Sequence, residues 1–215
     1  GRPDAFTRNI DESKWLSFTV TLNDPTFFRL MEAFTGNAAG TGGLVTFVDS
    51  SWLMSIVLAH QPHFLGQPKG IQVFWGYGLF VDQEGDFVKK KMSDCTGEDL
   101  LIELLGHLRF EARKEAVLAA ANCIPCMMPF ITSQFMPRAE GDRPEVRPAG
   151  TTNFAFIGQF CELPDDVVFT VEYSVRAAQT AVYSLLGLKK AVSPLYKAQF
   201  DLPVLFGSAK ALLSS

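Results

Sequence analysis

The chain has 215 residues, of which 47% are hydrophobic and 20% are charged, and its formal net charge is −4. This length and apolar fraction allow one sizeable core or parts of two, whereas the negative charge argues against a nucleic-acid partner. Four cysteines in a chain of this length do not indicate a disulfide scaffold, so we expect a reducing compartment.

The first half of the chain combines strand and helix patterns. Residues 15–22 alternate apolar and polar side chains, which is the period of a strand with one buried face. Asp24 followed by Pro25 predicts the N-terminus of a helix, and Gly36 predicts its end. Three further strands are expected at residues 44–47, 52–59 and 71–80.

Two helices are predicted next. The first runs from Thr96 to about Leu108, because Thr96 can cap its N-terminus and acidic residues occupy its first turn. The second is expected over residues 111–121.

The stretch from 116 to 137 carries no charged residue and is long enough to consider as a membrane span. Its prolines and polar side chains favour a buried strand or loop instead, and residues 128–135 are predicted to form an apolar strand or extended segment. Residues 138–150 are charged and rich in proline and glycine, which is typical of an exposed loop.

The most informative stretch is 153–188, NFAFIGQFCELPDDVVFTVEYSVRAAQTAVYSLLGL. Residues 154–157 are apolar enough to predict a buried strand, Gly158 predicts a turn, and a helix is expected over 168–186, ended by Gly187. Apolar residues recur near the helical period at Val168, Val171, Val175, Ala178, Val182 and Leu185. The start of such a helix suits an electron-rich ligand, because its N–H groups are unpaired and its dipole end is positive.

Several segments carry a resemblance to a known family. They are 9–21 (NIDESKWLSFTVT), 35–47 (TGNAAGTGGLVTF), 52–64 (WLMSIVLAHQPHF), 121–144 (ANCIPCMMPFITSQFMPRAEGDRP) and 153–178. On these segments the chain resembles the C-terminal part of the bacterial oleate hydratases, flavoproteins also called the myosin-cross-reactive antigen family. Chains of that family are much longer, so we expect this chain to be the last third of one, and its first residue, Gly1 rather than Met, agrees with that expectation.

The resemblance and the pattern of elements together imply a mixed α/β (α+β) fold. Residues 1–120 are expected to form part of a substrate-binding domain with a mixed or antiparallel sheet. Residues 121–190 are expected to be the C-terminal part of the FAD-binding domain, the closing strand–helix unit of a Rossmann-like fold. Residues 191–215 are expected to be a C-terminal tail.

The resemblance also implies a function. It implies a hydro-lyase that uses FAD and adds water across the cis-9 double bond of oleate to give 10-hydroxystearate, with oleate or linoleate as substrate. It places the catalytic residues upstream of this chain, so we expect the chain alone to be inactive. The full protein is expected to be a cytoplasmic homodimer with possible peripheral contact to a membrane.

Two other classes of function stay open. The same closing strand–helix unit serves flavin-dependent oxidoreductases of the amine oxidase and desaturase type. A non-catalytic fatty-acid-binding module would also use the many large apolar side chains of the first half.

Thr35 and Asn37 flank Gly36 and lead into a glycine-rich loop. From the residues alone, this pattern is most simply a helix C-cap with Asn in a left-handed conformation. A hydroxyl and an amide can also hold a carboxylate without a full countercharge. The resemblance favours the second role, because a Thr-x-Asn at this place in the oleate hydratases is thought to bind the fatty-acid carboxylate.

The resemblance further implies a flavin contact along residues 158–174. The turn at Gly158, Gln159 and Phe160 is expected to meet the ribityl part of FAD. The helix start is expected to face the isoalloxazine ring. The residues assigned to that contact are Val168, Phe169, Thr170, Val171 and Ser174. Gln159 stands where such proteins often have an acid, which departs from the pattern.

The remaining candidates have simpler interpretations. Cys123 and Cys126 have metal-like or redox-like spacing, but two buried soft side chains in a packed wall is the preferred interpretation, and no metal site is predicted. His60 and His63 are interpreted as structural histidines. The sequence Gly40–Thr41–Gly42–Gly43 precedes a strand, so it lacks the context of a dinucleotide-binding loop.

Overall fold

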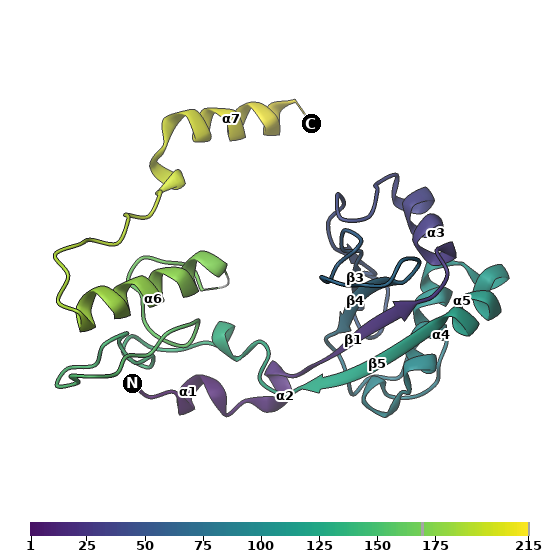
Figure 1. Cartoon of the computed structure of the whole chain (residues 1–215), viewed down its shortest axis with the longest axis horizontal. Helices are drawn as coiled ribbons and strands as arrows, with labels where there is room; N and C mark the ends of the chain where they lie inside the picture. The colour runs from purple at the N-terminus through teal and green to yellow at the C-terminus, as the bar shows by residue number, and fades with distance from the viewer. Residues whose placement is uncertain (169, 215) are drawn as a thin grey trace. The chain divides into compact units, whose positions relative to one another are not determined.

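The computed structural model describes residues 1–168 and 170–214, and these residues form two compact units. One unit is Asn9–Ser133, and the other combines Gly1–Arg8 with Gln134–Ser215 as far as described (Figure 1). The two units divide between Arg8 and Asn9 and between Ser133 and Gln134, and the domain boundary that we placed after residue 120 stays a prediction. Each unit is described separately below.

The unit of residues 9–133 is built on a five-stranded antiparallel sheet in the order β2-β3-β4-β1-β5. Its strands are β1 (Trp15–Leu22), β2 (Val45–Thr46), β3 (Ser55–Val57), β4 (Gln72–Gly78) and β5 (Ala121–Met128). The predicted strand over 15–22 is confirmed. The next three are confirmed in place but are shorter than predicted.

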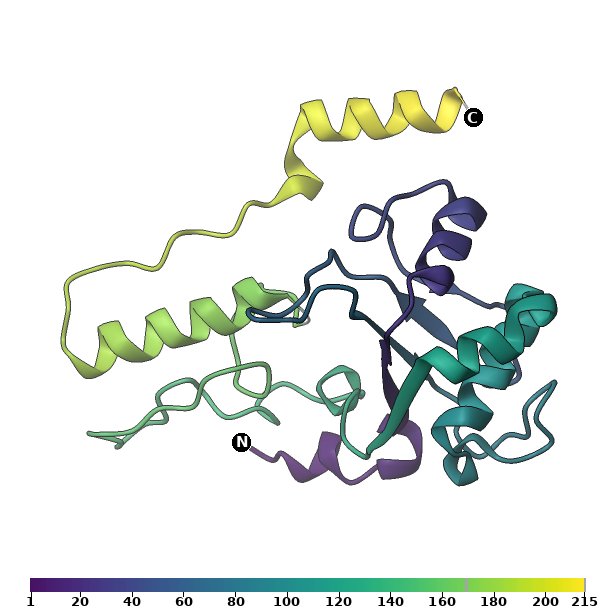
Figure 2. The same cartoon turned by 45° about the vertical axis from the view of Figure 1, so that its right-hand side comes forward.

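Helices cover the sheet and close its core. They are α2 (Ile10–Ser13), α3 (Thr26–Thr35), α4 (Gly97–Leu108) and α5 (Lys114–Ala120), with 3-10 turns η1 (Met92–Asp94) and η2 (Glu111–Arg113). Figure 2 shows α4 and α5 alongside β5. Phe27 of α3 stacks on Phe74 of β4 with their ring centroids 4.6 Å apart, and both side chains are almost fully buried.

The predicted helix starts and ends are largely confirmed in this unit. Thr96 caps α4 as predicted: its side chain accepts a hydrogen bond from Asp99 N, and the Asp99 carboxylate accepts one from Thr96 N. Gly36 ends α3 with a φ of +72°, the left-handed conformation that glycine adopts without strain.

The strand or extended segment predicted over residues 128–135 is wrong, because residues 129–132 form turns. The strand lies earlier, at β5, whose eight residues pair with the eight residues of β1 and end with Met128 opposite Trp15. Beyond Met128 the chain has run past the start of β1, so no strand is available there for pairing. It turns instead into the 3-10 helix η3 (Ser133–Phe135).

The second unit has a smaller core around α6 (Val171–Leu185). Its other elements are α1 (Asp4–Thr7), η4 (Ala198–Phe200) and α7 (Leu202–Leu213). The buried side chains that form this core are Val146, Cys161, Leu163, Tyr173, Ala177 and Ala181.

Two expectations fail in this unit. Residues 154–157 are not a strand: Phe156 N donates one backbone hydrogen bond to Val146 O (2.7 Å), and Phe154, Phe156 and Ile157 are exposed. A strand requires a ladder of such bonds with a neighbour, and the described residues of this unit provide a single one here. The helix begins at Val171 rather than 168, and Gly187, at φ +62°, follows its end as predicted.

The buried face of α6 differs from the valine stripe in the sequence. Val171, Val175 and Val182 are exposed, whereas Tyr173, Ala177 and Ala181 are buried. Small alanines let the helix approach the rest of this unit closely. Across the described residues, we find no helix with the length and apolar character needed to cross a membrane.

Candidate functional site

Thr35 and Asn37 form one polar cap at the end of α3. Thr35 Oγ1 donates a hydrogen bond to Met31 O (2.9 Å) and accepts one from Asn37 N (3.2 Å). Asn37 Nδ2 donates to Thr35 O across Gly36 (3.2 Å). The expected C-cap is therefore present, but the left-handed residue is Gly36 and not Asn37, as we had predicted. One N–H of the Asn37 amide remains for another acceptor.

The cap opens onto a pocket of about 160 Å³. The polar part of its lining comes from Thr35, Asn37 and the glycine-rich loop, and the apolar part comes from α3 and the strands that follow. The lining residues are Met31, Thr35, Asn37, Ala38, Ala39, Gly40, Gly42, Gly43, Leu44, Val45 and Leu58. The pocket thus joins neutral hydrogen-bonding groups to an apolar wall.

The glycine-rich loop is held in place from both sides of the pocket. Glu32 of α3 accepts a hydrogen bond from Ala39 N (2.8 Å), and Gly40 N donates one to Leu58 O (2.9 Å). Gly40 has a φ of +82°, and a Cβ there would lie 2.6 Å from the backbone of His60. Gly40 is therefore required for both its conformation and its close approach, and this loop forms a wall of the pocket.

A second apolar pocket of about 300 Å³ lies in the same unit. Its walls come from β1, β3, β4 and the segment after β3, and its lining is Thr19, Val57, Ala59, His63, Phe64, Val73, Phe74 and Trp75. Phe64 is 57% exposed, so this pocket has a solvent-accessible aromatic side chain at its edge. Some of the aromatic residues are thus core and others line open space, a division the sequence alone did not provide.

The residues predicted to contact a flavin lie at the surface of the second unit. Gly158 has a φ of +92°, and nothing lies within 4 Å of where its Cβ would be. Gln159, Val168 and Ser174 are half-buried, whereas Phe160 and Thr170 are exposed. Phe169 lies outside the described residues. Thr170 caps α6 by accepting a hydrogen bond from Tyr173 N (3.2 Å).

A shallow pocket of about 270 Å³ lies along the start of α6. Val171 lines it together with Glu172, Val175, Arg176, Gln179 and Ser193. Val171 is 75% exposed, so the first turn of α6 presents an apolar side chain beside the helix N-terminus. The other predicted flavin residues, as far as the structure describes them, do not line this pocket.

The two cysteines of the CxxC pattern cannot act together. Both lie on β5, where residues three apart point to opposite faces of the sheet and their Cα atoms are about 10 Å apart. A disulfide needs a Cα separation below about 7 Å. Burial raises the pKa of the Cys123 thiol to about 12, but Cys123 is half-buried and Cys126 is exposed, so the preferred interpretation as two buried residues is wrong for Cys126 and holds only in part for Cys123.

His60 and His63 are exposed. His63 packs edge-on against Phe64, with ring centroids 4.5 Å apart. Among residues 1–168 and 170–214, neither histidine forms an ion pair with a carboxylate, which an acid–base role would require.

A buried polar network in the second unit was not foreseen. The Tyr173 hydroxyl donates to Cys161 O (2.7 Å) and accepts from Leu163 N (3.1 Å) and Arg143 Nη1 (3.0 Å). Arg143 is 2% exposed and also donates to Gln134 O (2.6 Å). The sequence signal was a tyrosine among the small residues of α6, but its partners are too far along the chain to be paired by spacing.

The fold is mixed α/β, and the pocket is a small apolar site with uncharged polar groups at one end. Residues 1–183 match the MCRA family. The chain is 40% identical over 212 residues to the oleate hydratase of Streptococcus pyogenes serotype M49 (strain NZ131), covering 94% of this chain and 36% of that protein. It is 34% identical over 206 residues to the linoleate hydratase of Lactiplantibacillus plantarum, covering 87% of this chain and 36% of that protein.

The chain therefore belongs to the MCRA family, and the resemblance seen in the sequence is confirmed. It spans about a third of the length of the curated relatives that it matches.

Proposed function

We propose that this chain is part of a fatty-acid hydratase that adds water across the cis-9 double bond of oleate to give 10-hydroxystearate. Its likeness to an oleate hydratase and a linoleate hydratase supports this proposal. The observation in the structure that carries it is the pocket of about 160 Å³ that has Thr35 and Asn37 at its polar end.

We assign Thr35 and Asn37 to the fatty-acid carboxylate. One N–H of the Asn37 amide is free to donate, and Thr35 donates once its hydroxyl turns away from Met31 O. Each hydrogen bond to a charged group contributes about 1.5–3 kcal/mol, so two such bonds hold a carboxylate without a lysine or arginine. The N–H groups of Gly42 and Gly43, which form no hydrogen bond within the described residues, add two more donors to this wall.

The pocket holds only one end of the substrate. Sites for drug-sized ligands usually measure about 300–1,000 Å³, so 160 Å³ suits a carboxylate with its nearest methylene groups. The apolar walls formed by Met31, Leu44 and Leu58 suit those methylenes. The double bond would lie further along the acyl chain, near the residues that protonate the alkene and activate water, which we place outside this chain.

We propose FAD as the cofactor, with part of its contact surface in this chain. The open space around Gly158 and the exposed Val171 at the start of α6 allow a flat ring system to approach closely. Hydration involves no net redox change, so a bound flavin would supply structure and electrostatics. In this role, the turn of Gly158, Gln159 and Phe160 would hold the ribityl part. The first turn of α6 would position the isoalloxazine ring, and the positive end of the helix dipole would point toward that ring.

We also propose that the full protein is a cytoplasmic homodimer that takes both oleate and linoleate. Peripheral contact with a membrane agrees with α7, where Phe206, Leu212 and Leu213 are exposed.

The test is to incubate the full-length protein with oleate in ¹⁸O-labelled water, with and without FAD, and to analyse the product by mass spectrometry. The proposal predicts 10-hydroxystearate carrying one labelled oxygen. A product that has lost two hydrogens, with oxygen consumed, would instead identify a flavin oxidoreductase. Tight oleate binding with no product would identify a binding module.

A further inference from the structure

Three side chains that the fatty-acid site does not use converge in the unit of residues 9–133. Glu103 and His107 lie one turn apart on α4, and Asp86 lies in the loop before it. His107 Nε2 is 3.3 Å from Glu103 Oε1 and 3.3 Å from Asp86 Oδ2. The three possible ligand atoms all lie within 4.8 Å of one another.

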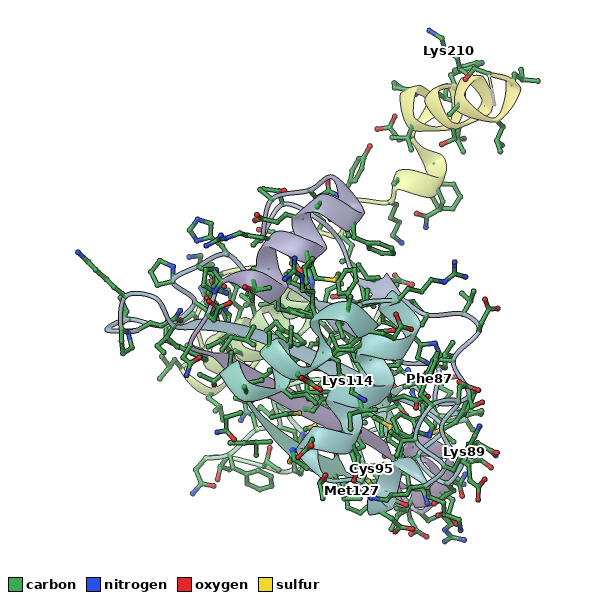
Figure 3. All side chains as sticks on the ribbon, turned by 90° about the vertical axis from the view of Figure 1, so that its right-hand side faces the viewer. Phe87, Lys89, Cys95, Lys114, Met127 and Lys210 are labelled. Carbon is green, nitrogen blue, oxygen red and sulfur yellow. The ribbon has the colours of Figure 1, made fainter. Side chains whose placement is uncertain are left out.

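The imidazole of His107 is buried and points into this cluster. Its side chain is 10% exposed, and its Nε2 atom has no hydrogen-bond partner among the described residues. Phe47 stacks on the ring at 5.6 Å, and Phe87 packs edge-on against it at 5.1 Å. The ring is therefore clamped in this orientation by aromatic side chains, one of which, Phe87, is labelled in Figure 3. A ring nitrogen that faces two carboxylate oxygens without a well-aligned hydrogen bond to either of them suits a cation bound among the three groups.

The two carboxylates are held toward His107 by hydrogen bonds that leave acceptor capacity. The fully buried Glu103 accepts from the backbone N–H groups of Asp86 (2.6 Å), Phe87 (2.9 Å) and Val88 (2.7 Å). Asp86 accepts from Ser51 N (2.8 Å) and Ser51 Oγ (2.6 Å). Each oxygen that faces His107 accepts one of these bonds and so keeps a second lone pair.

The chemistry of the three groups indicates which ion they can bind. Two preoriented carboxylates and one imidazole nitrogen form a ligand set that suits a divalent transition-metal ion.

We propose that Asp86, Glu103 and His107 bind a zinc ion, with water as the fourth ligand. Zinc takes nitrogen and carboxylate oxygen at about 2.0–2.2 Å, so neighbouring ligand atoms in a tetrahedron lie about 3.3–3.5 Å apart. The two distances of 3.3 Å from His107 Nε2 match that edge. The side chain of Asp86 is 36% exposed, which gives the ion a path and leaves room for water. The ion would tie the loop of residues 85–88 to α4.

The competing arrangement is a protonated His107 that bridges the two carboxylates with no ion present. The two arrangements respond oppositely to pH. Zinc binding weakens as pH falls, because the imidazole must lose its proton to bind the metal. A bridge without an ion needs a proton on the imidazole, so acid favours it.

The experiment uses the full-length protein, stripped with a chelator and titrated with zinc by calorimetry, with metal content measured by plasma mass spectrometry. His107→Gln and Asp86→Asn are the test variants, and His63→Gln, at an exposed histidine without a carboxylate partner, is the matched control. We avoid Glu103 because its loss would free the loop that it anchors.

The proposal predicts that each test variant binds one zinc fewer per chain, or binds it at least tenfold more weakly, while His63→Gln binds as the parent does. Zinc should raise the thermal midpoint of the parent and of His63→Gln but not that of His107→Gln. Cobalt should give the visible absorption of a tetrahedral site in the parent and in His63→Gln, but not in His107→Gln or Asp86→Asn. Equal zinc binding by the parent and His107→Gln overturns the proposal. The proposal is also overturned if the parent binds no zinc and its stability rises on acidification, while the stability of His107→Gln does not.

Discussion

The side-chain amide of Asn37 donates a hydrogen bond to the backbone carbonyl of Thr35 (3.2 Å), so the two residues act as one unit at the end of α3. The same two side chains line the pocket that we assign to the fatty-acid carboxylate. The capping role and the binding role therefore coexist at one place, and a mutation separates them only if stability and affinity are both measured.

Thr35→Ala combined with Asn37→Ala should weaken oleate binding by the full-length enzyme roughly ten- to a hundredfold, because hydrogen bonds to a charged group are lost. The loss of the cap should cost only about 1 kcal/mol of stability. Thr41→Ala is the matched control: Thr41 Oγ1 makes a similar local bond, to Ala38 O (2.7 Å), in the same loop, but it does not line the pocket. Unchanged affinity in the double variant, measured by calorimetry, would leave these residues with the capping role alone.

Gly40→Ala should reshape the wall of the pocket. The alanine must adopt a φ of +82° at a cost of about 1–2 kcal/mol, and its Cβ would meet the His60 backbone at 2.6 Å. We expect a lower thermal midpoint and weaker oleate binding. Gly66→Ala is the control, because Gly66 also has a positive φ (+75°) but has open space around it and does not line this pocket. Two variants with equal oleate affinity would mean that this wall does not contact substrate.

Val171→Glu should reduce FAD occupancy or lower the flavin reduction potential of the full-length protein. A fixed negative charge beside the ring disfavours the anionic reduced flavin, which the positive end of α6 would otherwise stabilise. Val182→Glu is the control, since Val182 is also exposed but lies about 16 Å further along the helix. If Val171→Glu keeps normal FAD content and an unchanged potential, the first turn of α6 is not at the flavin.

Tyr173→Phe should destabilise the second unit by about 1–3 kcal/mol, because the buried N–H of Leu163 and the guanidinium of Arg143 each lose an acceptor. Tyr183→Phe, on the same helix, should be nearly neutral, since its hydroxyl makes no hydrogen bond among the described residues. Urea denaturation followed by circular dichroism compares the two. Equal stability of both variants would show that the network contributes little.

Alkylation should distinguish the two cysteines of β5. Burial raises the pKa of Cys123 to about 12, so little thiolate forms near pH 8, whereas Cys126 is exposed to the reagent. Mass spectrometry after a short iodoacetamide treatment of the folded protein should find Cys126 modified well before Cys123. A rapid disulfide between them under mild oxidation would contradict their placement on opposite faces of the sheet.

The sequence predicted the elements in which the pattern and the packing agree. Residues 15–22 alternate strictly, and Leu16, Phe18, Val20 and Leu22 are all buried in the sheet. Thr96 and Asp99 form the capping box that their spacing indicates. In both cases the local pattern alone determines the geometry, so no knowledge of distant residues was needed.

The sequence failed where the outcome depends on a distant partner. The apolar residues 154–157 read as a buried strand, but a strand forms only beside another strand, and none pairs with them among the described residues. The valines of α6 have the stronger periodicity, yet Ala177, Ala181 and Tyr173 face the core because close approach and the Arg143 network decide the packing.

The cluster of Asp86, Glu103 and His107 was also missed. The spacing of Glu103 and His107, four residues apart on a predicted helix, was visible in the sequence. Asp86 joins them only because the loop before α4 folds back over the helix, with three of its N–H groups bound to Glu103.

The most direct test of the account compares the binding of oleate and methyl oleate to the full-length parent and to the Thr35→Ala, Asn37→Ala double variant. If Thr35 and Asn37 hold the carboxylate, the parent should prefer oleate by roughly tenfold or more, and the double variant should bind the two ligands almost equally. An undiminished preference for oleate in the double variant would place the carboxylate elsewhere and contradict the assignment of this pocket.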